Sequence, residues 1–274
     1  MKPGILFGNL VTLIAGMLLA SKGNLNLQIF VSAIAGLTCI MASGCICNNY
    51  IDRHIDQKMS RTKNRSIASG AIPVSKALLF AAALAISGSV ILLWYTNILA
   101  FGAAILGFVV YVFMYSLWKC RTIYGTAIGA VAGAMPPVVG YLAVSGKVDA
   151  GMCIFFLMMI LWQMPHFFAI AIRHIDDYAA AGIPVLPLMK TSTETKSRAL
   201  IYVMAFTLVA MQLTFFGYTG KIYLILILAL GSGWLLICIR GFKTSNDQQW
   251  GKEMFQYSLL TIMLLCLAIP LDKA

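Results

Sequence analysis

Charged residues are scarce in this sequence. They make up 11% of its 274 residues, whereas hydrophobic residues make up 61%; soluble domains carry about 25% charged residues. A soluble protein of this size could not hide so much apolar surface, because exposing it to water costs roughly 25 cal/mol per Å². The composition therefore excludes a soluble globular protein. The net charge of +11 does not indicate a nucleic-acid partner either, because no hydrophilic segment could form a soluble basic face.

Short cysteine and glycine motifs are also missing. The seven cysteines form no CxxC or CxxH pair, which makes a metal or disulfide role improbable, and we interpret them as small buried hydrophobic residues. No glycine-rich P-loop is found, so nucleoside triphosphate chemistry is not indicated.

Long apolar runs are what the sequence has instead. Runs of about 20 residues match a hydrocarbon core about 30 Å thick. We count nine and therefore predict an all-α, polytopic membrane bundle. The predicted spans are residues 4–20, 27–47, 77–95, 98–118, 125–145, 152–172, 199–219, 221–239 and 254–271.

The basic residues give these spans an orientation. All but four of the 20 basic residues fall in one set of alternate loops. The exceptions are Lys22, Lys147, Lys221 and Lys273. Because the richer side faces the cytoplasm, we expect a cytoplasmic N-terminus and, after nine spans, a C-terminus on the outer side.

Two inner loops are unusually long. Residues 48–76 join the second and third predicted spans, and residues 173–198 join the sixth and seventh. Both begin with acidic residues and continue with basic ones, and they lie four spans apart. This pairing predicts two pseudo-related four-helix halves plus one further helix, with sites at the interface between repeats, within a single membrane domain of residues 1–274.

Asn48, Asp52 and Asp56 are spaced i, i+4 and i+8, so on a helix they share one face. Like charges at this spacing repel each other, and a Mg²⁺ ion bound by these hard oxygen ligands and by substrate phosphates would relieve the repulsion. The alternative is a solvated helix end in which the two carboxylates pair with Arg53 or Lys58.

Basic residues surround these acids. Arg61, Lys63 and Arg65 follow within nine residues, an arrangement suited to binding a diphosphate beside a metal ion. Tyr115, Lys119 and Arg121 form a further phosphate-binding set, although the two cations could equally be ordinary basic residues of an inner loop.

Asp176 and Asp177 open the second long loop, and adjacent residues point about 100° apart on a helix. We therefore expect only one of them, Asp177, to face a shared metal ion, with Asp176 as its helper. Within the spans, Asn9 and His166 are candidates for contact with a cavity, because polar residues in spans usually face one. The alternative for His166 is a buried residue hydrogen-bonded across helices.

These motifs have a specific resemblance. The pattern Asn48-xxx-Asp52-xxx-Asp56-xx-Met59-x-Arg61-Thr62-xx-Arg65 is similar to the first aspartate-rich motif of the UbiA-type intramembrane prenyltransferases. The stretches 115–121, 133–141, 162–166 and 177–187 narrow the resemblance to the branch that farnesylates haem, and it extends over essentially the whole chain. Two departures are Ser66, where a proline often follows the arginine, and the second motif, which has no acid four residues after Asp177.

The resemblance implies a nine-helix bundle around a central cavity that is capped on the cytoplasmic side. It implies that farnesyl diphosphate donates its farnesyl group to a vinyl group of protohaem IX, for which Asn9 and His166 are candidate contacts. Asp52, Asp56 and Asp177 would be the catalytic acids and would hold Mg²⁺. The setting would be the lipid of a bacterial inner membrane, beside a haem A synthase or a terminal oxidase assembly. The allylic cation would lie against aromatic faces, for which Tyr50, Trp162, Phe167 and Phe168 are candidates.

Two other functions compete with this interpretation. Within the family, the acceptor could be an aromatic acid such as 4-hydroxybenzoate, although stretches 162–166 and 177–187 disfavour it. Outside the family, a secondary transporter could bind ions through acidic residues. The acids here are predicted at the cytoplasmic rim beside a basic cluster, which favours phosphate chemistry.

Overall fold

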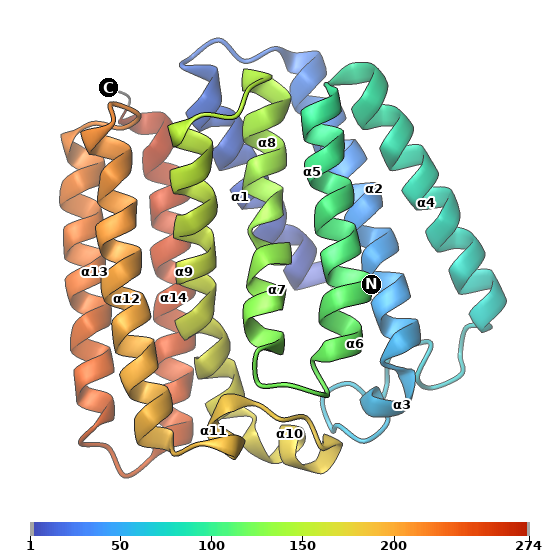
Figure 1. The fold of residues 1–274 in the computed structure, drawn as a ribbon, viewed down its shortest axis with the longest axis vertical. Helices are drawn as coiled ribbons and strands as arrows, with labels where there is room; N and C mark the ends of the chain where they lie inside the picture. Colours follow the sequence, from blue (N-terminus) through green and yellow to red (C-terminus); the bar gives the residue numbers. More distant parts are fainter. Residues whose placement is uncertain (1–2, 273–274) are drawn as a thin grey trace.

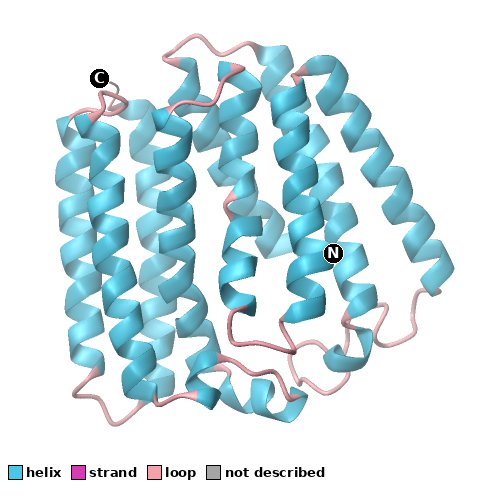
Figure 2. Cartoon of the chain, viewed as in Figure 1, coloured by secondary structure: helices cyan, strands magenta, loops and turns pink. Residues whose placement is uncertain are grey.

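The computed structural model describes residues 3–272, and these residues form helices and connecting loops without a strand (Figure 2). Within this range, nine segments, each a single helix or a run of consecutive helices, are long and apolar enough to span a membrane. Six are single helices before or after the central region: α1 (Pro3–Ser21), α2 (Leu27–Ile51), α4 (Val74–Tyr95), α12 (Ser192–Phe215), α13 (Lys221–Gly241) and α14 (Asp247–Leu271). The chain is a multi-pass membrane protein of the predicted all-α class.

The three central spans are Ile98–Trp118, Gly125–Ser145 and α9 (Ala150–Arg173). The first consists of α5 (Ile98–Val109), a π-helical turn η1 (Val110–Tyr115) and α6 (Ser116–Trp118). The second is divided into α7 (Gly125–Gly133) and α8 (Met135–Ser145). The division has a local cause, because Pro136 and Pro137 have no N–H to donate to the preceding turn.

Several helices are longer than the apolar runs that predicted them. The seventh span begins at Ser192 and ends at Phe215, not at residues 199 and 219. Thr191 caps its start by accepting a hydrogen bond from the Glu194 N–H, and Gly217, with φ of 73°, follows its end. The ninth span begins at Asp247 rather than at residue 254. Hydropathy marks the part of a helix that lies in hydrocarbon, whereas capping residues mark where the helix itself begins.

The spans pack around two hydrophobic cores. One core is built by α1, α2, α4, α5 and α8, and the other mainly by α9, α12, α13 and α14. Helix α1 contributes Leu13 to the first core and Leu19 to the second, so it is the additional helix between two groups of four spans. A repeat in sequence between the groups stays a prediction.

Helix α1 is in backbone contact with α8. A Cβ added to Gly16 would lie 2.2 Å from the Pro137 carbonyl oxygen, and one added to Gly140 would lie 2.1 Å from that of Leu13. Small residues are common where membrane helices approach this closely. The contact fixes α1 beside the divided span α7–α8, and both line the cavity described below.

Three short helices gather at one end of the bundle, which is the lower end in Figure 1. They are α3 (Arg53–Asp56), α10 (Ile175–Ala181) and α11 (Leu186–Met189). They belong to the two long loops that the sequence singled out. Because both loops lie at the same end, residues more than 100 positions apart in the chain become neighbours there.

Candidate active site

A cavity of about 770 Å³ lies among α1, α2, η1, α7, α9 and α14, within the usual size range of ligand pockets. Along α2 its wall changes character, from Leu37 and Ile40 to Asn48, and then to Asp52 and Asp56. Fifteen residues of helix from Leu37 to Asp52 span roughly 22 Å. The cavity is therefore a deep apolar chamber with acidic groups at the α3 end.

Asn48, Asp52 and Asp56 line this cavity together, as their spacing predicted. The helical path continues from α2 into α3, because the Asp52 N–H donates to the Asn48 carbonyl (2.9 Å) and the Asp56 N–H donates to that of Asp52 (2.8 Å). The three residues are 0%, 1% and 3% exposed. Burial at this level excludes the alternative of a solvated helix end.

Asp52 and Asp56 are each paired with a cation. The cations are not Arg53 or Lys58, which the sequence had offered as partners. Lys119 donates through Nζ to Asp52 Oδ2. Arg65 donates through one guanidinium nitrogen to both oxygens of Asp56, at 2.8 Å each. Such pairing compensates for the loss of hydration, so the site is close to neutral before any ligand binds.

One oxygen in this cluster lacks a partner among residues 3–272. Asp52 Oδ1 is buried and accepts no hydrogen bond, which is costly for a charged group. Asn48 lies one turn away and uses its amide nitrogen to donate to Ser116 Oγ at 2.8 Å. An unsatisfied carboxylate oxygen beside an amide suits a hard divalent cation. Within the described residues, no three His, Cys, Asp or Glu side chains come together as a metal-binding group.

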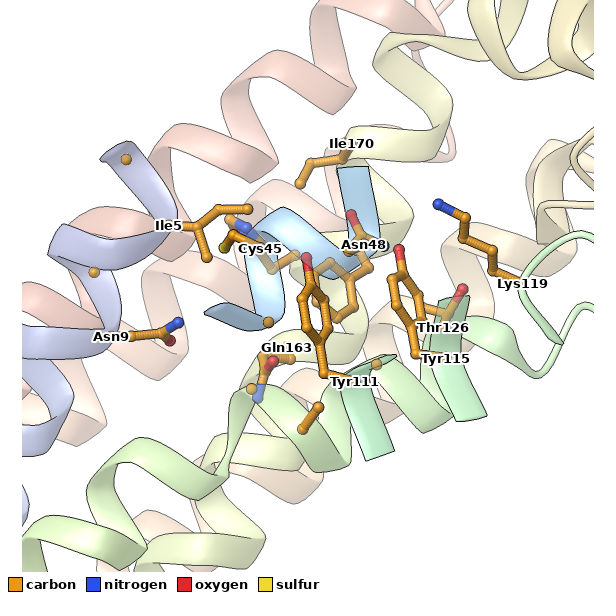
Figure 3. Close-up of a pocket in the computed structure, with 18 of the residues that line it drawn as sticks. Ile5, Asn9, Cys45, Asn48, Tyr111, Tyr115, Lys119, Thr126, Gln163 and Ile170 are labelled. Carbon is orange, nitrogen blue, oxygen red and sulfur yellow. The ribbon is translucent and has the colours of Figure 1, made fainter. Parts of the chain in front are cut away.

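Two tyrosines line the cavity beside Asn48, whose amide donates to Ser116, the residue that follows the second of them. Tyr111 and Tyr115 stack with ring centroids 5.7 Å apart and planes 9° apart, and Figure 3 shows both phenols pointing the same way, with Lys119 beside Tyr115. Lys119 Nζ lies 5.5 Å from the Tyr115 ring centre. Tyr111 was not predicted, although its i, i+4 spacing from Tyr115 puts the two on one helical face; both lie in the π-helical turn η1, a feature often found at functional sites.

The other predicted phosphate-binding residues separate into two groups. Arg61, Arg65, Tyr115 and Lys119 line the cavity. Lys63 is exposed and is not part of its wall. Arg121 lies in a separate shallow depression with Trp118 and Tyr124.

The second acidic pair also lies outside the cavity wall. Asp177 accepts hydrogen bonds from the Ser60 hydroxyl (2.7 Å) and the Ser60 N–H (3.2 Å), which lower the pKa of its carboxyl. Asp176 points elsewhere and accepts from Gln248 at 3.3 Å. The neighbouring Tyr178 lines the cavity, and burial raises the pKa of its phenol. The expected divergence of the two aspartates is found, and Asp177 joins the two long loops.

Both polar residues predicted within the spans, Asn9 and His166, line the cavity. So do Trp162 and Phe167 among the predicted aromatic residues, whereas Tyr50 and Phe168 do not. Gln163 and Phe255 are among the further cavity residues that were not predicted. Gln163 donates to the Ala130 carbonyl at 3.0 Å, which ties α9 to α7 near the break between α7 and α8.

Comparison with known proteins identifies relatives of the whole chain. The sequence profile of the UbiA prenyltransferase family matches residues 9–260. A protoheme IX farnesyltransferase of Protochlamydia amoebophila is 57% identical over 99% of this chain and 96% of its own length. One of Yersinia pseudotuberculosis is 45% identical over 99% of this chain and 92% of its own length.

Solved structures show the same fold at low identity. A structure of digeranylgeranylglyceryl phosphate synthase has a TM-score of 0.82 at 20% identity and covers 98% of this chain and 94% of its own. A UbiA homologue from Archaeoglobus fulgidus bound to DMAPP and Mg²⁺ has a TM-score of 0.74 at 15% identity and covers 98% and 96%. At these identities the likeness concerns the fold alone.

Proposed function

This chain belongs to the UbiA prenyltransferase family, and from that premise we propose that it transfers a farnesyl group from farnesyl diphosphate to a vinyl group of protohaem IX. The enzyme is a prenyltransferase, and its products are diphosphate and the farnesylated haem, haem O. The observation that carries the proposal is the buried pair Asp52 and Asp56 at the end of an apolar chamber, with one carboxylate oxygen that no described residue satisfies. Identity of 57% and 45% to protoheme IX farnesyltransferases favours haem over an aromatic acid as acceptor and over ion transport.

Mg²⁺ fits the acidic end of the cavity. Asp52 and Asp56 would hold it, with Asn48 as an oxygen ligand. Asp177, helped by Asp176, lies outside the cavity wall and is hydrogen-bonded to Ser60, so it would complete the set only if the second loop moved toward Asp52. A bound Mg²⁺ would supply Lewis-acid assistance to the departing diphosphate. Lys119 and Arg65 neutralise the two acids without ligand, and with substrate they would turn to the phosphate oxygens together with Arg61. Lys63 and Arg121 lie outside the cavity wall, so we propose that they act at its entrance.

The chain's own side chains account for the rest of the reaction. The bond between the farnesyl C1 and oxygen breaks with its electron pair passing to diphosphate, and the faces of Tyr111 and Tyr115 stabilise the allylic cation. A vinyl carbon of the haem bonds to C1. Water then adds a hydroxyl to the other vinyl carbon and releases a proton. The apolar wall around Leu37 and Ile40 holds the farnesyl tail and keeps water from the first cation.

We place the enzyme in a bacterial inner membrane, with residues 1–274 acting as one domain. The end that carries α3, α10 and α11 faces the cytoplasm, because it holds most of the basic loop residues. The N-terminus is then cytoplasmic and the C-terminus periplasmic. A haem A synthase or a terminal oxidase assembly in the same membrane would receive the product.

The direct test is reconstitution of the full chain in detergent with farnesyl diphosphate, protohaem and MgCl₂. We expect mass spectrometry to find protohaem heavier by one farnesyl group and one hydroxyl group, and EDTA to abolish the product. The parallel reaction with 4-hydroxybenzoate should give nothing. Prenylation of the aromatic acid in place of haem would contradict the proposal.

Metal and diphosphate should stabilise the protein together rather than separately. Without phosphate, Lys119 is paired with Asp52 and Arg65 with Asp56. Mg²⁺ alone must therefore break two ion pairs to bind these carboxylates. We expect MgCl₂ alone and pyrophosphate alone each to change the unfolding temperature little, and the two together to raise it by several degrees. Differential scanning fluorimetry in detergent measures this. If MgCl₂ alone raised the unfolding temperature as much as MgCl₂ with pyrophosphate, the ion pairs would not be hindering metal binding.

Asp177 can be tested apart from its role in joining the loops. We expect Asp177→Asn to lower turnover at least tenfold more than Ser60→Ala, because only the first variant removes the carboxylate, whereas both weaken the contact between them. Initial rates at saturating substrate compare the two. Equal effects would limit Asp177 to holding the loops together.

A further inference from the structure

His166 occupies a fixed position at the cavity wall. Its ring stacks on Trp162, with centroids 4.8 Å apart and planes 24° apart, and packs against Phe255 in a tilted arrangement, with centroids 5.0 Å apart and planes 31° apart. Aromatic groups therefore pack against the faces of the imidazole and leave its edge for polar contacts. His166 is 9% exposed, and it lines the cavity.

Ser258 of α14 fixes which nitrogen of this ring carries the proton. The Ser258 hydroxyl donates its only hydrogen to the Phe255 carbonyl at 2.6 Å. His166 Nδ1 lies 2.7 Å from the same Oγ. Because the hydroxyl hydrogen is already engaged, Nδ1–H must be the donor in this contact. The neutral ring then carries its lone pair on Nε2.

Ser258 also positions the stacking partner of His166. Its backbone carbonyl accepts a hydrogen bond from Trp162 Nε1 at 2.8 Å, and Ser258 itself is 0% exposed. One residue of α14 thus holds two residues of α9. Nε2 makes no hydrogen bond to another residue in the described part of the chain. The imidazole is therefore oriented by a hydrogen bond at Nδ1, and its Nε2 remains available on a residue that lines the cavity. This is the usual arrangement of a metal-binding histidine.

We propose that Nε2 of His166 binds the iron of the haem substrate and that Ser258 is the positioning residue for this ligand. The inference rests on the proposed function, because that function places haem in the cavity. Iron ligation from α9 would hold the porphyrin by its centre and set the distance of its vinyl groups from the tyrosines. The hydrogen bond from Nδ1 raises the basicity of the ligand, so its loss should weaken iron binding.

The test is haem binding by the full chain in detergent, followed by absorption and resonance Raman spectroscopy, without farnesyl diphosphate. We expect the spectrum of histidine-ligated haem from the wild type. His166→Ala should lose this spectrum and bind haem at least tenfold more weakly, and added imidazole should restore the spectrum. Ser258→Ala should keep histidine ligation and weaken binding roughly tenfold. His54→Ala, which removes an exposed histidine outside the cavity, is the matched control and should bind as the wild type does.

Metal-free protoporphyrin IX separates iron ligation from shape. It should bind the wild type and His166→Ala equally, because it has no iron. Equal weakening for both porphyrins, or an unchanged haem spectrum in His166→Ala, would overturn the inference. If His166→Ala is not monodisperse on size exclusion, His166→Gln retains a polar side chain of similar volume and undergoes the same comparison.

The farnesyl-transfer assay distinguishes this inference from the proposed function. Haem farnesylation by a wild type that shows no histidine ligation would overturn the inference alone. Histidine-ligated haem in a wild type that forms no farnesylated product would support the ligand and contradict the proposed function.

Discussion

Asp52→Asn should lower turnover by about a thousandfold while the protein still folds. The substitution keeps the shape of the side chain but removes the negative charge of a carboxylate whose Oδ1 lacks a partner among residues 3–272 and whose Oδ2 accepts from Lys119. Metal assistance supplies several kcal/mol of transition-state stabilisation, and each 1.36 kcal/mol is a factor of ten in rate. Single-turnover measurements at saturating farnesyl diphosphate and haem report this loss directly.

The control for Asp52→Asn is Glu253→Gln. Glu253 is exposed on α14 and, within the described residues, accepts only from Gln249, at 3.0 Å, so removing its charge should leave turnover unchanged. Size-exclusion profiles of both variants should match the wild type, because Lys119 retains partial access to solvent when its partner is neutral. Turnover of Asp52→Asn within tenfold of the wild type would contradict a metal-binding role for this residue.

Arg65→Ala should cost both stability and activity. Asp56 is 3% exposed, and both of its oxygens accept from Arg65. Removing one partner of a buried pair costs about 3–5 kcal/mol, because the other charge stays buried and uncompensated; the 25% exposure of the Arg65 side chain places the expected loss at the lower end. Thermal unfolding in detergent measures the stability, and initial rates should fall because diphosphate loses a cation.

Two further variants test whether the stability lost in Arg65→Ala comes from the uncompensated charge of Asp56. Arg53→Ala removes an arginine from α3, the short helix of Asp56. Arg53 donates to the Tyr50 carbonyl at 2.8 Å and lies outside the cavity wall, so its removal should cost only about 1 kcal/mol. Adding Asp56→Asn to Arg65→Ala removes the uncompensated charge and should recover much of the stability without recovering turnover. A double variant no more stable than Arg65→Ala would show that the guanidinium stabilises the loop through packing instead.

The acidic motif shows how far local reasoning reaches. The spacing of Asn48, Asp52 and Asp56 placed three groups on one helical face, and the structure has them on one wall of the cavity. The same reasoning offered Arg53 and Lys58 as partners, because they are adjacent in sequence. The structure pairs Asp52 with Lys119 instead, a residue from the end of a different span.

The contacts of the second long loop, residues 173–198, could not be predicted from local spacing. Divergence of Asp176 and Asp177 followed from the helical angle between neighbours, but their actual partners, Gln248 and Ser60, lie 72 and 117 positions away in the chain. Tyr111 was missed although its i, i+4 spacing from Tyr115 was a usable signal; what the spacing did not show is that both rings face the cavity. Arg121 was grouped with Lys119 from proximity in sequence, although it lies in a different depression.

The sequence by itself determined that this chain spans a membrane, how often it does so, and which residues share a face of the second span. Those properties follow from apolar length and helical period, which act over neighbouring residues. Only the tertiary structure decided which cation neutralises which acid, which aromatic rings face them, and that His166 is held by Ser258. These contacts depend on the packing angles and axial offsets of helices that meet across the cavity, and spacing along one chain does not specify them.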